Sequence, residues 1–193
     1  MISGKSFSTL LSLTLLVCAA GSVPGEESIS LGEILRPAEQ AQTMRFQEQK
    51  QLGILEQTLT DSGILRFIPP DTLIREMDGP SGMTYRIQGN QLSISKEGQI
   101  IRQLDLQANP QLAGFAVTLR ALLKADIQTL QQQYDLKLTG TVESWVLQLT
   151  PRDGLVSRII ERIAIAGGNQ RIRVIDTYET GGDHSHMTLM SNE

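Results

Sequence analysis

The sequence is poor in the residues on which many enzymes and nucleic-acid-binding proteins depend. Its 193 residues include one cysteine, two histidines and one tryptophan, and aromatic residues make up 4%. Proteins that stack bases usually carry more aromatic side chains and a basic patch. Here 17 lysine and arginine residues stand against 21 aspartate and glutamate residues. This acidic balance argues against a nucleic acid as partner, although it leaves room for a local basic patch.

The N-terminal segment has the features of a cleaved signal peptide. Lys5 supplies a short positive region, and residues 7–20 are apolar or small throughout. This is the length of a signal-peptide core and is too short for a spanning helix. We therefore expect a signal peptide over residues 1–22 and an exported domain over residues 23–193.

The single cysteine lies in this segment. Small residues permit cleavage after Ala20 or after Ser22, and either cut removes Cys18. Lipidation of Cys18 is the less favoured alternative, because the residue before a lipidated cysteine is normally small and Val17 is bulky. A mature chain without cysteine has no disulfide, so packing alone must stabilise it.

Between residues 43 and 106 the chain alternates apolar and polar residues in short runs that turn residues separate. A period of two is typical of strands with one covered face. Strands are expected over residues 43–50, 63–68, 72–77, 83–87, 92–94 and 100–106. Their regular spacing and short turns favour an antiparallel meander.

Three segments show helical spacing instead of a period of two. Ser30 and Glu33 have capping-box spacing and predict a short helix at the start of the domain. Asn109 followed by Pro110 is typical of a helix N-terminus, and apolar residues at helical spacing follow as far as residue 123. Asp126 is the expected cap of a third helix that runs to residue 134.

Strands return after the helices. They are expected over residues 136–139, 143–150, 159–166, 170–178 and 184–190. A sheet of about ten to eleven strands curls, because strand twist accumulates. The expected fold is mainly β with α: an incomplete antiparallel β-barrel with a helical lid. The pattern leaves two alternatives open, a filled interior and a hollow one.

Seven segments also carry a likeness to a known family. They are FQEQK (46–50), SGILRF (62–67), PDTL (70–73), GNQL (89–92), RALLKAD (120–126), WVLQLTP (145–151) and DHSHMTL (183–189). In order and spacing they resemble the periplasmic outer-membrane lipoprotein carrier family, LolA. The likeness is greater still to the LolA-related branch found beside lipid and polyene synthesis genes, and it covers roughly residues 31–190.

The resemblance implies a non-enzymatic carrier that moves acylated cargo from an inner-membrane exporter to an outer-membrane acceptor. It implies an apolar cavity under the helical lid and no cofactor, and we expect a monomer. In the family an arginine next to a strand-end proline helps to hold the empty cavity closed. Pro69 occupies the matching position here, and Arg66 would substitute only if it faced the lid.

A carrier needs an apolar pocket, since sheltering an acyl chain from water gains about 0.8 kcal/mol per CH₂. The side chains expected to line it are Met44, Phe46, Leu65, Phe67, Met83, Tyr85, Leu92, Leu112, Phe115, Leu119, Leu122 and Trp145. The same apolar stripes are also typical of an ordinary core. The alternative function is therefore a periplasmic interaction or scaffold module with a filled interior and no ligand.

The two histidines are the remaining candidates for chemistry. His184 and His186 share one face of a predicted strand. With Asp183 they make too few ligands for a metal site, and none is expected. A serine hydrolase would need one of them as base, but Ser81 does not lie in a Gly-x-Ser-x-Gly elbow. A lipid-processing enzyme that uses these histidines is therefore only the third hypothesis, after the carrier and the interaction module.

Four arginines form a basic cluster on neighbouring predicted strands. They are Arg158, Arg162, Arg171 and Arg173. Such a cluster is usually a solvated outer face, and the alternative is a docking patch for an acidic partner or a lipid head group.

Overall fold

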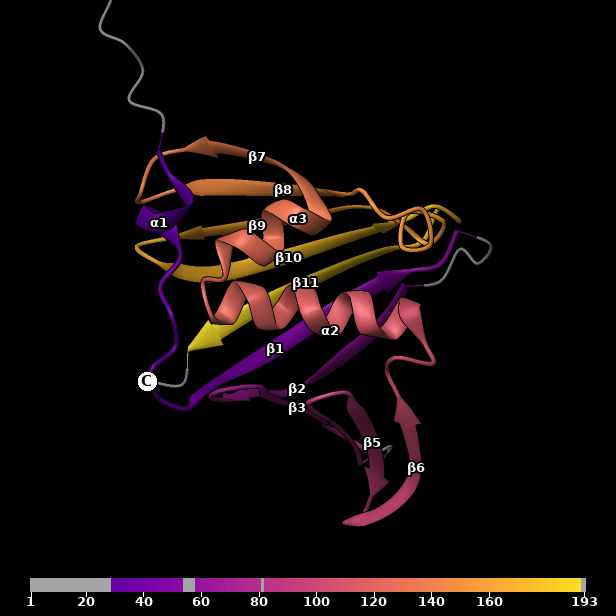
Figure 1. Cartoon of the computed structure of the whole chain (residues 1–193). Helices are drawn as coiled ribbons and strands as arrows, with labels where there is room; N and C mark the ends of the chain where they lie inside the picture. The colour runs from indigo at the N-terminus through magenta and orange to yellow at the C-terminus, as the bar shows by residue number, and fades with distance from the viewer. Residues whose placement is uncertain (1–28, 54–57, 81, 192–193) are drawn as a thin grey trace, which may run out of the picture.

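The computed structural model describes residues 29–53, 58–80 and 82–191, with the backbone alone described for residues 110–115. In this part of the chain eleven strands form one antiparallel sheet, and three helices accompany it (Figure 1). The sheet is curled but not closed. The predicted class, an incomplete antiparallel barrel with helices, is confirmed.

The strands are β1 (Gln42–Gln51), β2 (Thr58–Ile68), β3 (Thr72–Met77), β4 (Met83–Gln88), β5 (Gln91–Lys96), β6 (Gln99–Asp105), β7 (Tyr134–Gly140), β8 (Trp145–Pro151), β9 (Ile160–Gly168), β10 (Arg171–Glu179) and β11 (His184–Ser191). The helices are α1 (Leu31–Ile34), α2 (Pro110–Leu123) and α3 (Ile127–Gln133). Of these described helices, none combines the length and apolar character that crossing a bilayer requires.

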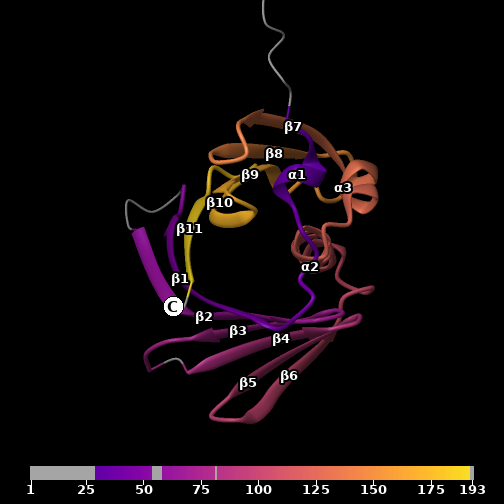
Figure 2. The ribbon, with the colours of Figure 1, turned by 90° about the vertical axis from the view of Figure 1, so that its left-hand side faces the viewer.

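The order of strands in the sheet explains where the helices lie. The order is β6-β5-β4-β3-β2-β1-β11-β10-β9-β8-β7, so the first and last strands pair in the middle. Because β6 and β7 lie at opposite edges, the chain between them must pass from one edge to the other. Helices α2 and α3 make this crossing; α2 lies opposite β1 and β11, and α3 lies beside β7 (Figure 2). The connection between the two meanders therefore becomes the lid.

Side-chain hydrogen bonds form at the N-termini of two helices, as predicted. The backbone N–H and the hydroxyl of Ser30 each donate a 2.7 Å hydrogen bond to Glu33, which lowers the pKa of that carboxyl. Asp126 accepts a 3.0 Å bond from the Thr129 backbone at the start of α3. Asn109 is the N-cap residue of α2 and Pro110 is its first residue, as predicted, but the Asn109 side-chain amide turns back and donates to the Asp105 carbonyl at 2.8 Å instead of capping the helix.

Two strand boundaries also differ from the prediction. β2 begins at Thr58 because the long β1 strand continues to pair with it as far as Gln51. Tyr134 belongs to β7, since it pairs with Pro151 rather than extending α3.

Large buried side chains fill the half of the interior that β7, β8 and β9 cover. Those at most 2% exposed in this half are Trp145, Tyr134, Ile34, Leu130, Leu147, Leu149 and Ile165. The Trp145 ring packs so closely on Gly167 that a Cβ there would lie 2.4 Å from it. This half is therefore a conventional close-packed core.

Candidate ligand cavity

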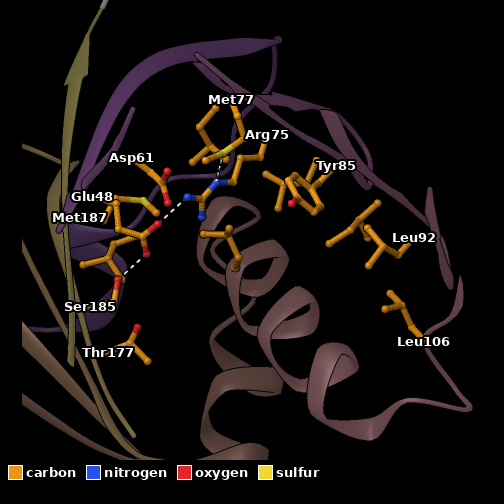
Figure 3. Close-up of a pocket in the computed structure, with 15 residues that line it drawn as sticks. Glu48, Asp61, Arg75, Met77, Tyr85, Leu92, Leu106, Thr177, Ser185 and Met187 are labelled. Carbon is orange, nitrogen blue, oxygen red and sulfur yellow. Dashed lines mark hydrogen bonds and ion pairs between the residues drawn. The ribbon is translucent and has the colours of Figure 1, made fainter. Parts of the chain in front are cut away.

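The other half of the interior contains a cavity of about 350 Å³ beneath α2 (Figure 3). Its apolar lining residues are Leu65, Leu73, Met77, Tyr85, Ile87, Leu92, Leu106, Leu119, Ile175 and Met187. Its volume lies at the lower end of the range for ligand pockets, about 300–1,000 Å³. We call this space the main cavity.

One end of the main cavity is polar. Glu48 accepts hydrogen bonds from the Arg75 guanidinium and from the Ser185 hydroxyl. Arg75 also donates to the sulfur of Met77 at 3.3 Å, and its guanidinium carbon lies 4.4 Å from the centre of the Phe46 ring. The Glu48 and Arg75 side chains are 15% and 24% exposed, so their charges are paired in a largely enclosed space. The opposite end is apolar, as Figure 3 shows.

A second cavity of about 280 Å³ adjoins the first. The two share a wall made by Leu65, Leu119 and Ile175. Among the described residues, no side chain of β7, β8 or β9 lines either cavity. The two cavities thus lie on either side of an apolar wall, and both are outside the close-packed half of the interior.

Alternation along β2 and β3 decides which residues reach the main cavity. Leu65, Leu73, Arg75 and Met77 line it, whereas their strand neighbours Arg66, Ile74 and Glu76 do not. Arg66 accordingly pairs with Glu76 at 3.6 Å on the outer face. The condition under which Arg66 would hold the lid is therefore not met.

Two polar contacts attach α2 to neighbouring segments. Arg120 donates to the backbone carbonyl of Gly89 in the β4–β5 turn, and the Ala38 backbone N–H donates to the Leu123 carbonyl at 2.9 Å. The lid is thus tied to one side of the sheet and to the segment that follows α1.

The structure brings half of the predicted lining residues around the hollow. Those that line one or both cavities are Met44, Leu65, Tyr85, Leu92, Leu119 and Leu122. Phe46, Phe67 and Trp145, each at most 1% exposed, pack in the core, and Met83 at the start of β4 lines neither cavity. The side chains of Leu112 and Phe115 lie outside the described residues. Whether the six residues bind a ligand stays a prediction.

Sequence reasoning missed several residues that face the hollow. They include Glu48, Leu73, Arg75, Ile87, Leu106 and Ile175. The period of two in β3 is the signal that would have found Leu73 and Arg75.

The histidines lie on the outer face, away from the cavities. His184 Nε2 and His186 Nδ1 lie 3.1 and 2.7 Å from the same Asp176 oxygen. Asp183 instead accepts a 2.8 Å bond from the Gly53 backbone. In the described part of the chain, no group of three or more histidine, cysteine, aspartate or glutamate residues is arranged to hold a metal ion. Ser185 lies on the inner face, so it does not join these histidines in a catalytic arrangement.

The predicted basic cluster is divided between two places. Arg162 lies over the Tyr178 ring on the outer face, 3.6 Å from its centre. Arg171 instead lines the second cavity.

A curled open sheet with an apolar cavity under a helical lid is the arrangement that the resemblance implied. The family model for outer membrane lipoprotein carrier protein LolA-like proteins matches residues 23–192. The chain belongs to this family, as predicted. No curated protein matches the chain significantly in sequence.

Similar solved structures share little sequence with this chain. A LolA superfamily protein from Nitrosomonas europaea is 12% identical, with 84% of this chain and 91% of that chain covered and a TM-score of 0.46. A putative outer membrane lipoprotein-sorting protein domain from Vibrio parahaemolyticus is 8% identical, with 78% and 83% covered and a TM-score of 0.43. A DUF1329 family protein from Desulfovibrio piger is 14% identical, with 84% and 89% covered and a TM-score of 0.43.

Proposed function

We propose that the protein is a periplasmic, non-enzymatic carrier that shelters the acyl chains of a lipoprotein or lipid and moves this cargo from the inner to the outer membrane. The observation that carries the proposal is the apolar main cavity beneath α2. Membership of the LolA-like family, whose members are periplasmic carrier or binding proteins, supports it. An inner-membrane exporter and an outer-membrane acceptor are the corresponding partners.

Carriage of this kind needs no reacting group. Moving about ten CH₂ groups out of water into an apolar cavity gains about 8 kcal/mol before the costs of ordering the chain. In this proposal the apolar end of the main cavity takes the chain, and Leu119 on α2 contacts it. The wall of Leu65, Leu119 and Ile175 opens as the chain enters, so that both cavities are used.

Residues 1–22 are the proposed signal peptide of this carrier. They lie outside the described residues. Intact-mass measurement of the secreted protein should give a chain that begins at residue 21 or residue 23.

Titration with a fluorescent fatty-acid probe tests the carrier function. Leu119→Glu places a charge in the wall between the cavities and should weaken probe binding at least tenfold. Leu155→Glu is the matched control, because Leu155 is 53% exposed and lines neither cavity, so its binding should equal that of the wild type.

A second variant separates loss of the cavity from loss of the fold. Leu92→Trp adds bulk at the apolar end without adding charge, and thermal unfolding shows whether each variant is folded. A folded Leu92→Trp protein should also bind the probe weakly. If wild type binds no probe, or if both cavity variants bind as wild type does, the carrier function is wrong and an interaction module becomes the better account.

A further inference from the structure

The mouth of the second cavity is positively charged. Arg36, in the segment after α1, and Arg171, the first residue of β10, both line it. Of the described residues that line this cavity, none is an aspartate or a glutamate. The rim therefore carries two positive charges that no lining carboxylate balances.

The two arginines differ from the arginine of the main cavity. Arg75 is paired with Glu48. Within the described chain, neither Arg36 nor Arg171 has a carboxylate within the 4.0 Å that defines an ion pair. Both side chains are thus available to an anion from outside the protein.

The exposed and the buried lining residues of this cavity differ in polarity. Gln42, Thr43, Gln170 and Ser191 add hydroxyl and amide groups to the lining, and they are exposed or half-buried, as Arg36 and Arg171 are exposed. The buried lining residues are apolar and include Leu122, Leu123 and Leu189, together with the wall shared with the main cavity. A positively charged rim next to two adjoining apolar spaces complements an amphiphile with an anionic head and an apolar tail.

We propose that the cargo is an anionic amphiphile whose phosphate or carboxylate head lies between Arg36 and Arg171. Its acyl chain passes Leu65, Leu119 and Ile175 and ends in the main cavity. Guanidinium groups suit such heads, because their planar N–H groups bind phosphate and carboxylate oxygens in pairs. This inference rests on the proposed carrier function and narrows its cargo.

Calorimetric titration of the full mature chain with ligands of one acyl length tests the head-group preference. Oleate and oleoyl lysophosphatidate supply the anionic heads, and monooleoylglycerol supplies a neutral one, each below its micelle concentration. Two ion pairs at a partly exposed rim should make the anionic ligands bind about tenfold tighter, and salt should reduce this difference.

Charge-removing variants locate the preference. Arg36→Gln with Arg171→Gln should bind oleate and monooleoylglycerol with similar affinity, while its affinity for monooleoylglycerol stays at the wild-type value. Arg173→Gln is the matched control: it removes the same charge from the same strand, but Arg173 does not line the second cavity. This control should keep the wild-type preference.

Four outcomes would overturn the inference. If wild type binds both kinds of ligand equally, or if the double variant keeps the preference, the head-group site is wrong while the carrier function stands. If inorganic phosphate competes as well as the amphiphile does, the arginines bind free anions rather than a lipid head. If no ligand binds at all, the carrier function itself fails.

Discussion

Arg120 of α2 donates a 2.8 Å hydrogen bond to the backbone carbonyl oxygen of Gly89 in the turn between β4 and β5. A second bond from Arg120, to the Ala116 carbonyl at 3.2 Å, holds the side chain along the helix. Gly89 itself donates to the Asp71 carboxylate at 3.1 Å. An arginine of the helix thus attaches the lid to the strands that line the main cavity. In the family that this chain resembles, the corresponding arginine lies on the sheet, at the position that Pro69 occupies here.

Arg120→Ala should loosen this attachment. Hydrogen bonds to charged groups contribute about 1.5–3 kcal/mol, and partial exposure of Arg120 reduces the expected loss of unfolding free energy to about 1 kcal/mol. Backbone amides of residues 116–123 should exchange hydrogen faster, which mass spectrometry can measure. Lys124→Ala, at the exposed end of the same helix, is the control. Unchanged exchange in Arg120→Ala would show that this bond does not hold the lid.

Glu48→Ala should destabilise the protein by about 2 kcal/mol, because it leaves the Arg75 charge in an enclosed space without its partner. The Ser185 hydroxyl loses its acceptor as well. Adding Arg75→Met should recover most of this loss, since the guanidinium that lost its partner is then absent. Urea unfolding of the two single variants and the double variant measures the coupling. Additive losses would contradict the account of this ion pair.

Gly167→Ala should disturb the filled half of the interior. Its Cβ would lie 2.2 Å from the Arg171 carbonyl oxygen and 2.4 Å from the Trp145 ring, so we expect a loss of about 1–3 kcal/mol. Gly154→Ala is the control, because nothing lies within 4 Å of a Cβ there. Trp145 is the single tryptophan, so its fluorescence reports the change directly. Equal stability of the two variants would show that the contact on Gly167 is looser.

Tyr134 should make stability depend on alkaline pH. Burial raises the pKa of its phenol above the ordinary value of 10.0, and its hydrogen bond with Thr118 partly opposes this. The unfolded chain then loses this proton first, so the contribution is complete below about pH 10 and is lost as the pH rises above it. Tyr134→Phe should lack this decline. Parallel curves of unfolding free energy for the two proteins between about pH 8 and about pH 11 would contradict it.

The positions of the strands, their antiparallel arrangement and the curl of the sheet followed from the sequence, because they depend on local patterns and on strand twist. Alternation placed the strands to within a few residues, and the spacing of His184 and His186 put them on one face, where both meet Asp176. The start of α2 at Asn109 and Pro110 was also predicted, although the Asn109 side chain bonds to the preceding Asp105 carbonyl instead of capping the helix.

The hollow could not be derived from the pattern alone. Leu92 lines the main cavity and Leu147 is fully buried in the core, yet both are inward-facing apolar residues of alternating strands. Whether such a residue faces a cavity or a packed core depends on the distance between the curled sheet and α2, and the periodicity of a single strand does not determine that distance. The pairing of Glu48 with Arg75 could not be predicted for a related reason, because it depends on the packing of segments distant in sequence.

Native mass spectrometry of the protein as secreted by its own cells tests the central claim most directly. The account predicts a complex heavier than the mature chain by the mass of an acyl lipid, which dissociates on activation and is absent from Leu119→Glu. A delipidated sample should regain one such ligand on incubation with acyl lipids. A bare chain mass before and after incubation would contradict the claim that the curled sheet encloses a lipid-binding space.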